Sequence, residues 1–172
     1  MTWIAPQIER RDMPTASGER EMLQRWLDWH RETLLTKCAG LTPEQLVTAS
    51  APPSNLTLLG LVRHMTEVER SWFRQRFLGE QTGDLYFRAD NHDADFEDAA
   101  PAGAEDDFAA FRAEIVSCDA AMTDHGLDET FAGPRDLTLN LRWIYVHLIE
   151  EYARHNGHAD LLRERIDGAT GD

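Results

Sequence analysis

The chain has 172 residues, a formal net charge of −14 at pH 7, and a composition in which 42% of residues are hydrophobic and 28% are charged. These proportions are typical of a globular protein and exclude wholesale disorder. The acidic balance argues against nucleic acid and against anionic membranes as partners, because both attract cationic surfaces. The length fits one domain, which we expect to span residues 1–172.

Several features of the sequence bear on the cellular compartment. No apolar run approaches the ~20 residues that a membrane helix requires. The N-terminal segment lacks the apolar core of a signal peptide, because Arg10 and Arg11 lead into a loop-like stretch at residues 14–18. Cys38 and Cys118 lack a CxxC pattern and fall on apolar stripes, which predicts two reduced core residues. We therefore expect a cytoplasmic protein.

Four long segments show the 3.6-residue periodicity of amphipathic helices. No stretch alternates with the two-residue period of a strand, so no sheet is expected. A short additional helix is predicted at residues 42–45, where Thr42, Pro43 and Gln45 form a capping box. The long helices are predicted from Ser17 to Gly40, from about residue 54 to 78, around residues 108–122, and from about 138 to 166.

A long connection, residues 79–105, joins the second and third predicted helices. It is rich in Asp, Gly and Ala, and we interpret it as a crossover packed over one end of a helical bundle. The carboxylates of residues 90–95 lack the spacing of a calcium-binding loop, which favours a solvated loop. With an N-terminal extension at residues 1–17, the pattern predicts an all-α four-helix bundle with one long crossover between helices two and three.

The row of the fourth helix that is predicted to face the interior contains residues unusual in a core. A buried, unpaired glutamate is costly, and a divalent metal is a natural compensating charge. Glu151 and His155 are four residues apart, so both can reach one ion from the same face. The row, in steps of three and four, is Leu141, Ile144, Leu148, Glu151, His155, His158 and Leu162.

A third ligand is predicted from the second helix, where His64 lies within the apolar face. Two histidines and one carboxylate are a recognised catalytic zinc set that leaves a coordination position open for water or substrate. The same set suits non-haem iron, and nickel is also compatible. We therefore predict a divalent metal, with zinc favoured, held by His64, Glu151 and His155.

Structural roles for the same residues are open at this point. A histidine on an apolar face is often a hydrogen-bonded core residue, and Glu151 could pair with Arg63 or Arg154 instead. The absence of an HExxH motif excludes a zincin. None of the seven histidines has a glutamate three residues before it, which argues against a di-iron bundle.

Two motifs resemble those of the DinB/YfiT-like superfamily. Residues 58–64 (LLGLVRH) with 69–73 (ERSWF) resemble its second-helix motif, and residues 150–160 (EEYARHNGHAD) resemble its C-terminal motif. The likeness covers about residues 19–168 and is closest to the actinobacterial mini-circle-like branch. It places the family's metal ligands on His64 and His155. A glutamate at position 151 resembles the mycothiol-dependent maleylpyruvate isomerases, whose ligands are similarly two histidines and a glutamate.

The resemblance also implies a function. Relatives of known activity use bacillithiol or mycothiol, which implies a divalent-metal-dependent thiol S-transferase that joins such a thiol to an electrophile. A metal-dependent hydrolase or isomerase that activates water and a non-catalytic metal-binding or stress-response module are the alternatives. The expected partners are a small-molecule thiol and an electrophile, with a homodimer as an option.

Other residues are assigned to the surroundings of this site. His147, one turn before Glu151, is expected at a flank. Trp26 and Trp72 are interpreted as either pocket wall or core. The side chains expected to line the pocket or to support the ligands are His158, His30, Arg63 and Arg154.

Overall fold

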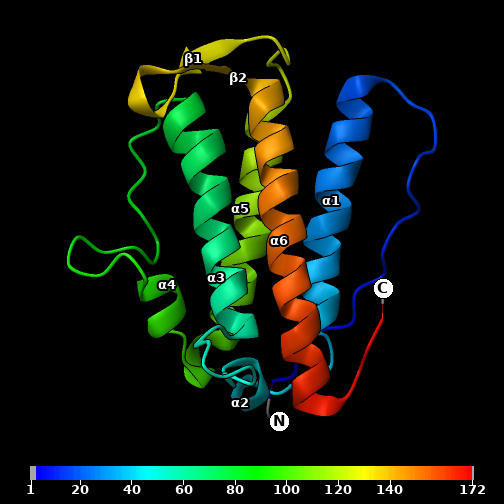
Figure 1. Cartoon of the computed structure of the whole chain (residues 1–172). Coiled ribbons are helices and arrows are strands. Elements are labelled where there is room, and N and C mark those ends of the chain that lie inside the picture. Colours follow the sequence, from blue (N-terminus) through cyan, green and yellow to red (C-terminus); the bar gives the residue numbers. More distant parts are fainter. Residues whose placement is uncertain (1–2, 172) are drawn as a thin grey trace.

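The computed structural model describes residues 3–171 and is mostly helical, which confirms the helical class predicted from the sequence (Figure 1). The expected domain also includes residues 1, 2 and 172, which lie outside the described residues. Residues 1 and 2 belong to the expected N-terminal extension. Within residues 3–171, no helix combines the length and hydropathy needed to cross a membrane. Four long helices of this range lie side by side: α1 (Glu19–Cys38), α3 (Leu58–Glu69), α5 (Ala104–Met122) and α6 (Leu141–Asp167).

Shorter elements join these helices. Helix α2 (Pro43–Leu46) has the predicted capping box, in which the side chains of Thr42 and Gln45 each accept a backbone N–H of the other residue. Helix α3 continues into a π-helix, η1 (Arg70–Phe77). The crossover contains α4 (Ala94–Glu97) and the 3₁₀ turn η2 (Pro101–Gly103), and the 3₁₀ turn η3 (Pro134–Asp136) lies between the strands β1 (Thr130–Ala132) and β2 (Thr138–Asn140).

The small antiparallel sheet was not predicted. In it, Phe131 of β1 lies opposite Leu139 of β2. Strands of three residues are too short to give a recognisable alternating pattern, and the helical periodicity predicts residues 138–140 as part of the last helix instead. That helix begins at Leu141, because the Asn140 side chain accepts the backbone N–H of Trp143 and caps it.

The buried face of α6 is rotated by about one residue from the predicted row. Glu151, His155 and His158 are only partly buried. Hydropathy predicts tyrosine and asparagine at the surface, but both can be buried when their polar atoms form hydrogen bonds. The Tyr152 hydroxyl donates to Glu69 at 2.8 Å, and the side-chain amide of Asn156 donates to the carbonyl of His30 at 3.0 Å. The buried residues are Leu141, Ile144, Tyr145, Leu148, Tyr152, Asn156, Ala159 and Leu162.

A buried ion network joins the four long helices. Arg31 of α1 forms two parallel hydrogen bonds with Glu69 of α3, Nε to Oε1 at 2.6 Å and Nη2 to Oε2 at 2.5 Å. Their side chains are 3% and 0% exposed. Arg31 Nη1 also contacts Asp119 of α5 at 2.9 Å, and Tyr152 contributes from α6. Every charge in the network has a partner, which burial requires.

Helix α4 lies against the first half of α3 (Figure 1). The Arg63 guanidinium donates to the backbone carbonyls of Asp95 at 2.7 Å and Ala94 at 3.0 Å. Phe96 packs on Gly60, where a Cβ atom would lie 3.0 Å from the Phe96 ring. The expectation of a solvated loop is therefore wrong for Asp95, which is 1% exposed.

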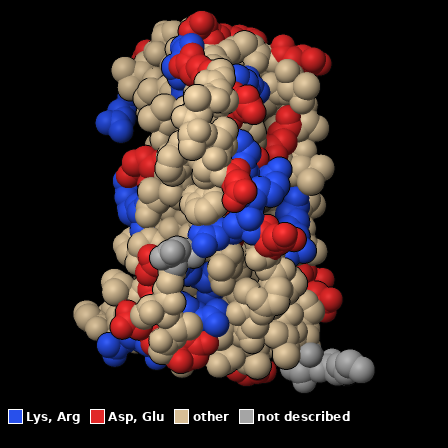
Figure 2. Space-filling view, turned by 90° about the vertical axis from the view of Figure 1, so that its right-hand side faces the viewer, with Lys and Arg blue, Asp and Glu red and all other residues tan. Residues whose placement is uncertain are grey.

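One face of the molecule carries charges of both signs close together. Figure 2 shows basic side chains gathered among carboxylates on the face that carries α1 and the N-terminal segment. There, Arg11 and Arg25 pair with Asp28 and Glu32 at 2.9–3.6 Å. Pairs of this kind contribute little individually, ~0–1 kcal/mol, but they hold the N-terminal segment against α1.

Candidate metal centre

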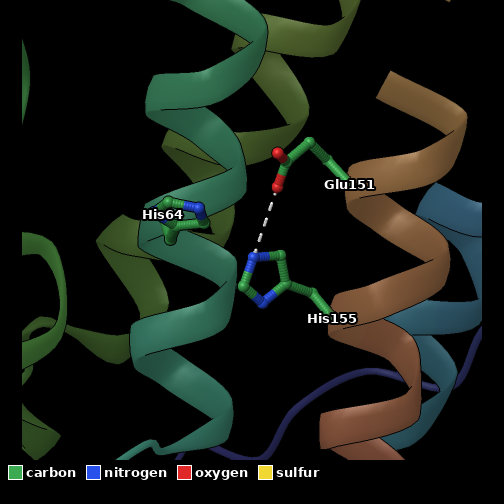
Figure 3. Close-up of side chains that lie close together, drawn as sticks. All are labelled: His64, Glu151 and His155. Carbon is green, nitrogen blue, oxygen red and sulfur yellow. Dashed lines mark ion pairs between the residues drawn. The ribbon is translucent and has the colours of Figure 1, made fainter. Parts of the chain in front are cut away.

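Side chains from two neighbouring helices meet between α3 and α6. Glu151 and His155 extend from α6 toward α3, where His64 lies (Figure 3). One candidate ligand atom from each residue lies within 4.8 Å of the other two. Nε2 of His155 is 3.5 Å from Oε2 of Glu151, and the rings of His64 and His155 meet edge to face with centroids 4.8 Å apart. The structure therefore brings together the three residues that the sequence predicts as metal ligands.

The donor set fits a divalent metal. Bonds from zinc to histidine nitrogen or carboxylate oxygen are ~2.0–2.2 Å, so two ligands of one ion lie at most about 4.4 Å apart. The candidate ligand atoms lie up to 4.8 Å apart, so they must approach one another by a few tenths of an ångström to bind one ion. Small side-chain rotations can supply this movement. The side chains of His64, Glu151 and His155 are 19%, 16% and 12% exposed, so an ion can reach them from solvent.

The surroundings of His155 favour a neutral imidazole. Burial lowers its pKa to about 4, and the charges of His64, His158 and Arg154 act in the same direction. A histidine must be neutral to bind a metal, so His155 is available as a ligand at neutral pH. Its Nδ1 lies 3.4 Å from Nδ1 of His158, whereas its Nε2 faces Glu151. His158 therefore supports His155 from the side away from the carboxylate.

The three residues form part of the wall of an open cleft of about 420 Å³. A cleft of this size can admit a small molecule. Its remaining wall combines apolar and polar side chains. Beside His64, Glu151 and His155, the apolar lining residues are Leu56, Val68, Trp72 and Phe96, and the polar ones are His147 and Arg154.

The other residues expected near the site have different roles. Neither His158 nor His30 lines this cleft, which differs from the predicted pocket wall. His30 of α1 instead contacts Asn156 of α6, and burial lowers the pKa of His30. Arg63 does not line the cleft, and its guanidinium contacts α4 and Asp107. Arg154 lies 3.5 Å from Glu151, which agrees with the alternative that these two residues pair. Arg154 also pairs with the neighbouring carboxylate of residue 150.

The two tryptophans considered as pocket wall also differ. Trp72 lines the cleft, whereas Trp26 is 44% exposed on α1 and does not line it. The indole of Trp72 meets the ring of His147, with centroids 4.7 Å apart, and both contact Trp143. The Trp72 side chain thus contributes to an aromatic surface at one side of the candidate site.

Sequence reasoning placed one residue only at the flank of this site and missed another. His147, expected at a flank, lines the cleft and has Nε2 3.9 Å from Oε1 of Glu151. Its four-residue spacing from Glu151 is the signal that connects it with the site. Asp95 contacts Nδ1 of His64 with Oδ2 at 2.7 Å. No local pattern pointed to Asp95, because it lies 31 residues away in an Asp-rich connection.

Fold and site together define a helical domain in which neighbouring helices bring two histidines and a glutamate to the wall of a cleft. A family model described as mycothiol-S-transferase matches residues 22–168, and the chain belongs to this family. The family is part of the DinB/YfiT-like superfamily, so the superfamily predicted from the sequence is confirmed. A search among curated proteins finds no match.

Proposed function

We propose that the chain is a divalent-metal-dependent thiol S-transferase built on a four-helix bundle. It joins mycothiol, or a similar low-molecular-weight thiol, to an electrophilic small molecule. The observation that carries the proposal is the meeting of His64, Glu151 and His155 at the wall of an open cleft. Membership in the mycothiol-S-transferase family supports a small-molecule thiol as one substrate.

The two imidazoles and the Glu151 carboxylate are the groups that hold the metal in this proposal. Zinc is the metal that this donor set favours, and iron or nickel is compatible with it. A divalent metal bound there lowers the pKa of a coordinated thiol, so that a thiolate nucleophile exists at neutral pH. The low pKa of His155 keeps this ligand neutral in the same pH range.

The rest of the cleft has roles that follow from its chemistry. Burial lowers the pKa of His147, so its imidazole is neutral near pH 7 and is placed to accept the proton that a thiol releases. Arg154, half exposed at the rim, balances the charge of Glu151. The side chains of Trp72 and Phe96 exclude water and offer apolar contact to the electrophile.

The test is a paired measurement on protein purified without a histidine tag. Metal content is measured by mass spectrometry, and conjugation of mycothiol to an alkylating electrophile is followed through the product mass. We expect bound divalent metal, metal-dependent conjugation, and a change in the visible spectrum of the cobalt-substituted protein when thiol is added. Replacement of His92, an exposed histidine in the crossover, by Ala is the matched control for His155→Ala.

The outcomes separate the alternatives. Hydrolysis of the electrophile without added thiol contradicts the transferase and supports activation of water. Metal that is retained without any reaction supports a non-catalytic metal-binding protein. Equal metal content in the wild type and in His155→Ala excludes the site itself.

A further inference from the structure

A buried carboxylate from the crossover contacts one of the candidate metal ligands. Asp95 of α4 is 1% exposed, and its Oδ2 lies 2.7 Å from Nδ1 of His64. We propose that Asp95 is a positioning residue that holds His64 in the Nδ1–H tautomer and thereby leaves Nε2 as its metal-binding nitrogen. This inference rests on the metal site proposed above.

The hydrogen-bond chemistry determines which nitrogen of His64 is free. An ionised carboxylate can only accept hydrogen bonds, so in the contact with Asp95 the proton lies on Nδ1 of His64. In a neutral imidazole the other nitrogen, Nε2, then carries the lone pair. Metal-bound histidines commonly donate their second N–H to a carboxylate, which fixes the tautomer and the ring orientation and makes the ligand more basic.

Asp95 is itself held firmly. Its second oxygen, Oδ1, accepts the backbone N–H of Phe96 at 3.0 Å, and its backbone carbonyl accepts Nε–H of Arg63 at 2.7 Å. The Phe96 ring stacks on His64, with centroids 4.9 Å apart and planes at 26°. Burial keeps water from competing for the contact between Asp95 and His64, so the bond has a fixed direction.

The structure predicts what an isosteric change would do. Both carboxylate oxygens of Asp95 accept an N–H, one from His64 and one from Phe96. Asp95→Asn keeps the size of the side chain but replaces one acceptor with an NH₂ donor. The backbone N–H of Phe96 needs the remaining oxygen, so the NH₂ group faces Nδ1 of His64 and favours the Nε2–H tautomer. Helix α4 should stay in place, because the Arg63 hydrogen bonds to the backbone and the contact of Phe96 with Gly60 do not involve the carboxylate.

Asp93 offers a matched control. It is exposed, it precedes the same short helix, and its side chain makes no capping hydrogen bond. Asp93→Asn therefore removes the same charge from almost the same place without touching His64. An effect shared by Asp93→Asn and Asp95→Asn is electrostatic, whereas an effect of Asp95→Asn alone belongs to the contact with His64.

The tautomer is measured directly on the metal-free protein. Long-range ¹H–¹⁵N spectra of histidine-labelled protein in mildly alkaline buffer distinguish protonated from unprotonated ring nitrogens, and His64→Ala assigns the signals. We expect His64 to carry its proton on Nδ1 in the wild type and in Asp93→Asn. In Asp95→Asn we expect a shift toward the Nε2–H form. A wild-type proton on Nε2 overturns the proposal, whether or not the protein binds metal.

Zinc affinity gives the second readout, measured by competition with a chelator. We expect Asp95→Asn to weaken binding by about 10- to 100-fold and Asp93→Asn to leave it unchanged. In a His64→Ala background, Asp95→Asn should have no further effect, because Asp95 acts through His64. Equal losses in both backgrounds contradict the inference. A wild-type protein that binds no zinc contradicts the proposed function, while the tautomer of His64 still decides the role of Asp95.

Discussion

Glu151 and Tyr152 are consecutive in α6, yet one lines the cleft and the other lies in the core. Glu151 is 3.5 Å from His155, whereas the Tyr152 hydroxyl donates to buried Glu69 at 2.8 Å. Successive side chains of a helix with 3.6 residues per turn point about 100° apart, which allows this division. The candidate site therefore lies directly beside the buried ion network, but the two can be changed separately.

Replacing His155 by Ala is expected to reduce metal retention and thiol transfer while the fold survives. The physical reason is that the variant removes one of three ligands, whereas the interior is formed by other residues, among them the buried row of α6. In a zinc finger, by contrast, metal binding supplies the folding free energy. Metal content after dialysis and the helical circular dichroism signal are the two measurements.

Glu151→Gln tests the carboxylate ligand, and Glu164→Gln, which changes an exposed carboxylate of the same helix outside the candidate ligands, is its matched control. Glu164→Gln should leave metal content unchanged. Glu151→Gln should lower metal content and alter the stability of the metal-free protein little, because this carboxylate keeps partial exposure and lies near Arg154. Collapse of the fold on metal loss would instead indicate a structural metal.

Removing Glu69 is expected to cost much more stability than removing Glu151. Glu69→Ala leaves Arg31 in the interior without its bidentate partner, although Asp119 still contacts it. Loss of one member of a buried pair typically costs ~3–5 kcal/mol of unfolding free energy. Urea denaturation of the metal-free protein measures the change.

Tyr152→Phe, which removes one hydrogen bond to Glu69, should cost less, about 1.5–3 kcal/mol. A value below about 1 kcal/mol for Glu69→Ala would show that the pair is not essential to the core.

The sequence predicted the helical class and selected the three residues that meet, but the face of α6 was misplaced. Apolar periodicity located the helix, and the four-residue spacing of Glu151 and His155 identified their common side. Hydropathy could not show that Tyr152 and Asn156 are inside, because their burial depends on Glu69 and on the His30 carbonyl. These partners come from other helices and leave no local signal.

The role of the crossover could not be predicted for a similar reason. Asp95 lies in a run of carboxylates, and composition alone indicates solvation for all of them. Its burial depends on Arg63 binding the backbone of α4 and on the absence of a side chain at Gly60. Both features are tertiary contacts. A glycine and an arginine at these positions of α3 are compatible with many ways of packing the crossover, so the sequence pattern does not indicate which one forms.

The two cysteines are expected to be unreactive in the folded protein. Cys38 and Cys118 are both buried, and burial raises the pKa of Cys38 to about 12 and that of Cys118 further. The thiolate is the reactive form, so a disulfide reagent should modify neither residue near neutral pH until denaturant is added. Rapid labelling of the native protein would contradict this expectation. Any thiol chemistry of the native protein must then come from an added thiol.

The tyrosines predict how stability changes at alkaline pH. Burial is the main reason that the pKa of Tyr145 is raised from 10.0 to about 12, and the pKa values of Tyr86 and Tyr152 are also raised. The unfolded chain releases these protons near pH 10, whereas the folded chain retains them. The free energy of unfolding should therefore be unaffected below this range and fall as pH rises from 10.0 toward 12. Tyrosinate absorbance should appear together with unfolding, and separate ionisation in the folded protein would contradict the prediction.

A change at Trp72 tests the apolar wall of the cleft separately from the metal ligands. Its indole lines the cleft but offers no metal ligand, so Trp72→Ala should leave metal content unchanged and raise KM for an apolar electrophile. We expect an increase of the order of tenfold, equivalent to about 1.4 kcal/mol of lost contact. Trp26→Ala is the matched control, because Trp26 is exposed on α1 and does not line the cleft.

A fall in kcat at constant KM would indicate that Trp72 positions a reacting group, such as His147, rather than the electrophile. Equal kinetics in both variants would show that the electrophile binds elsewhere along the cleft.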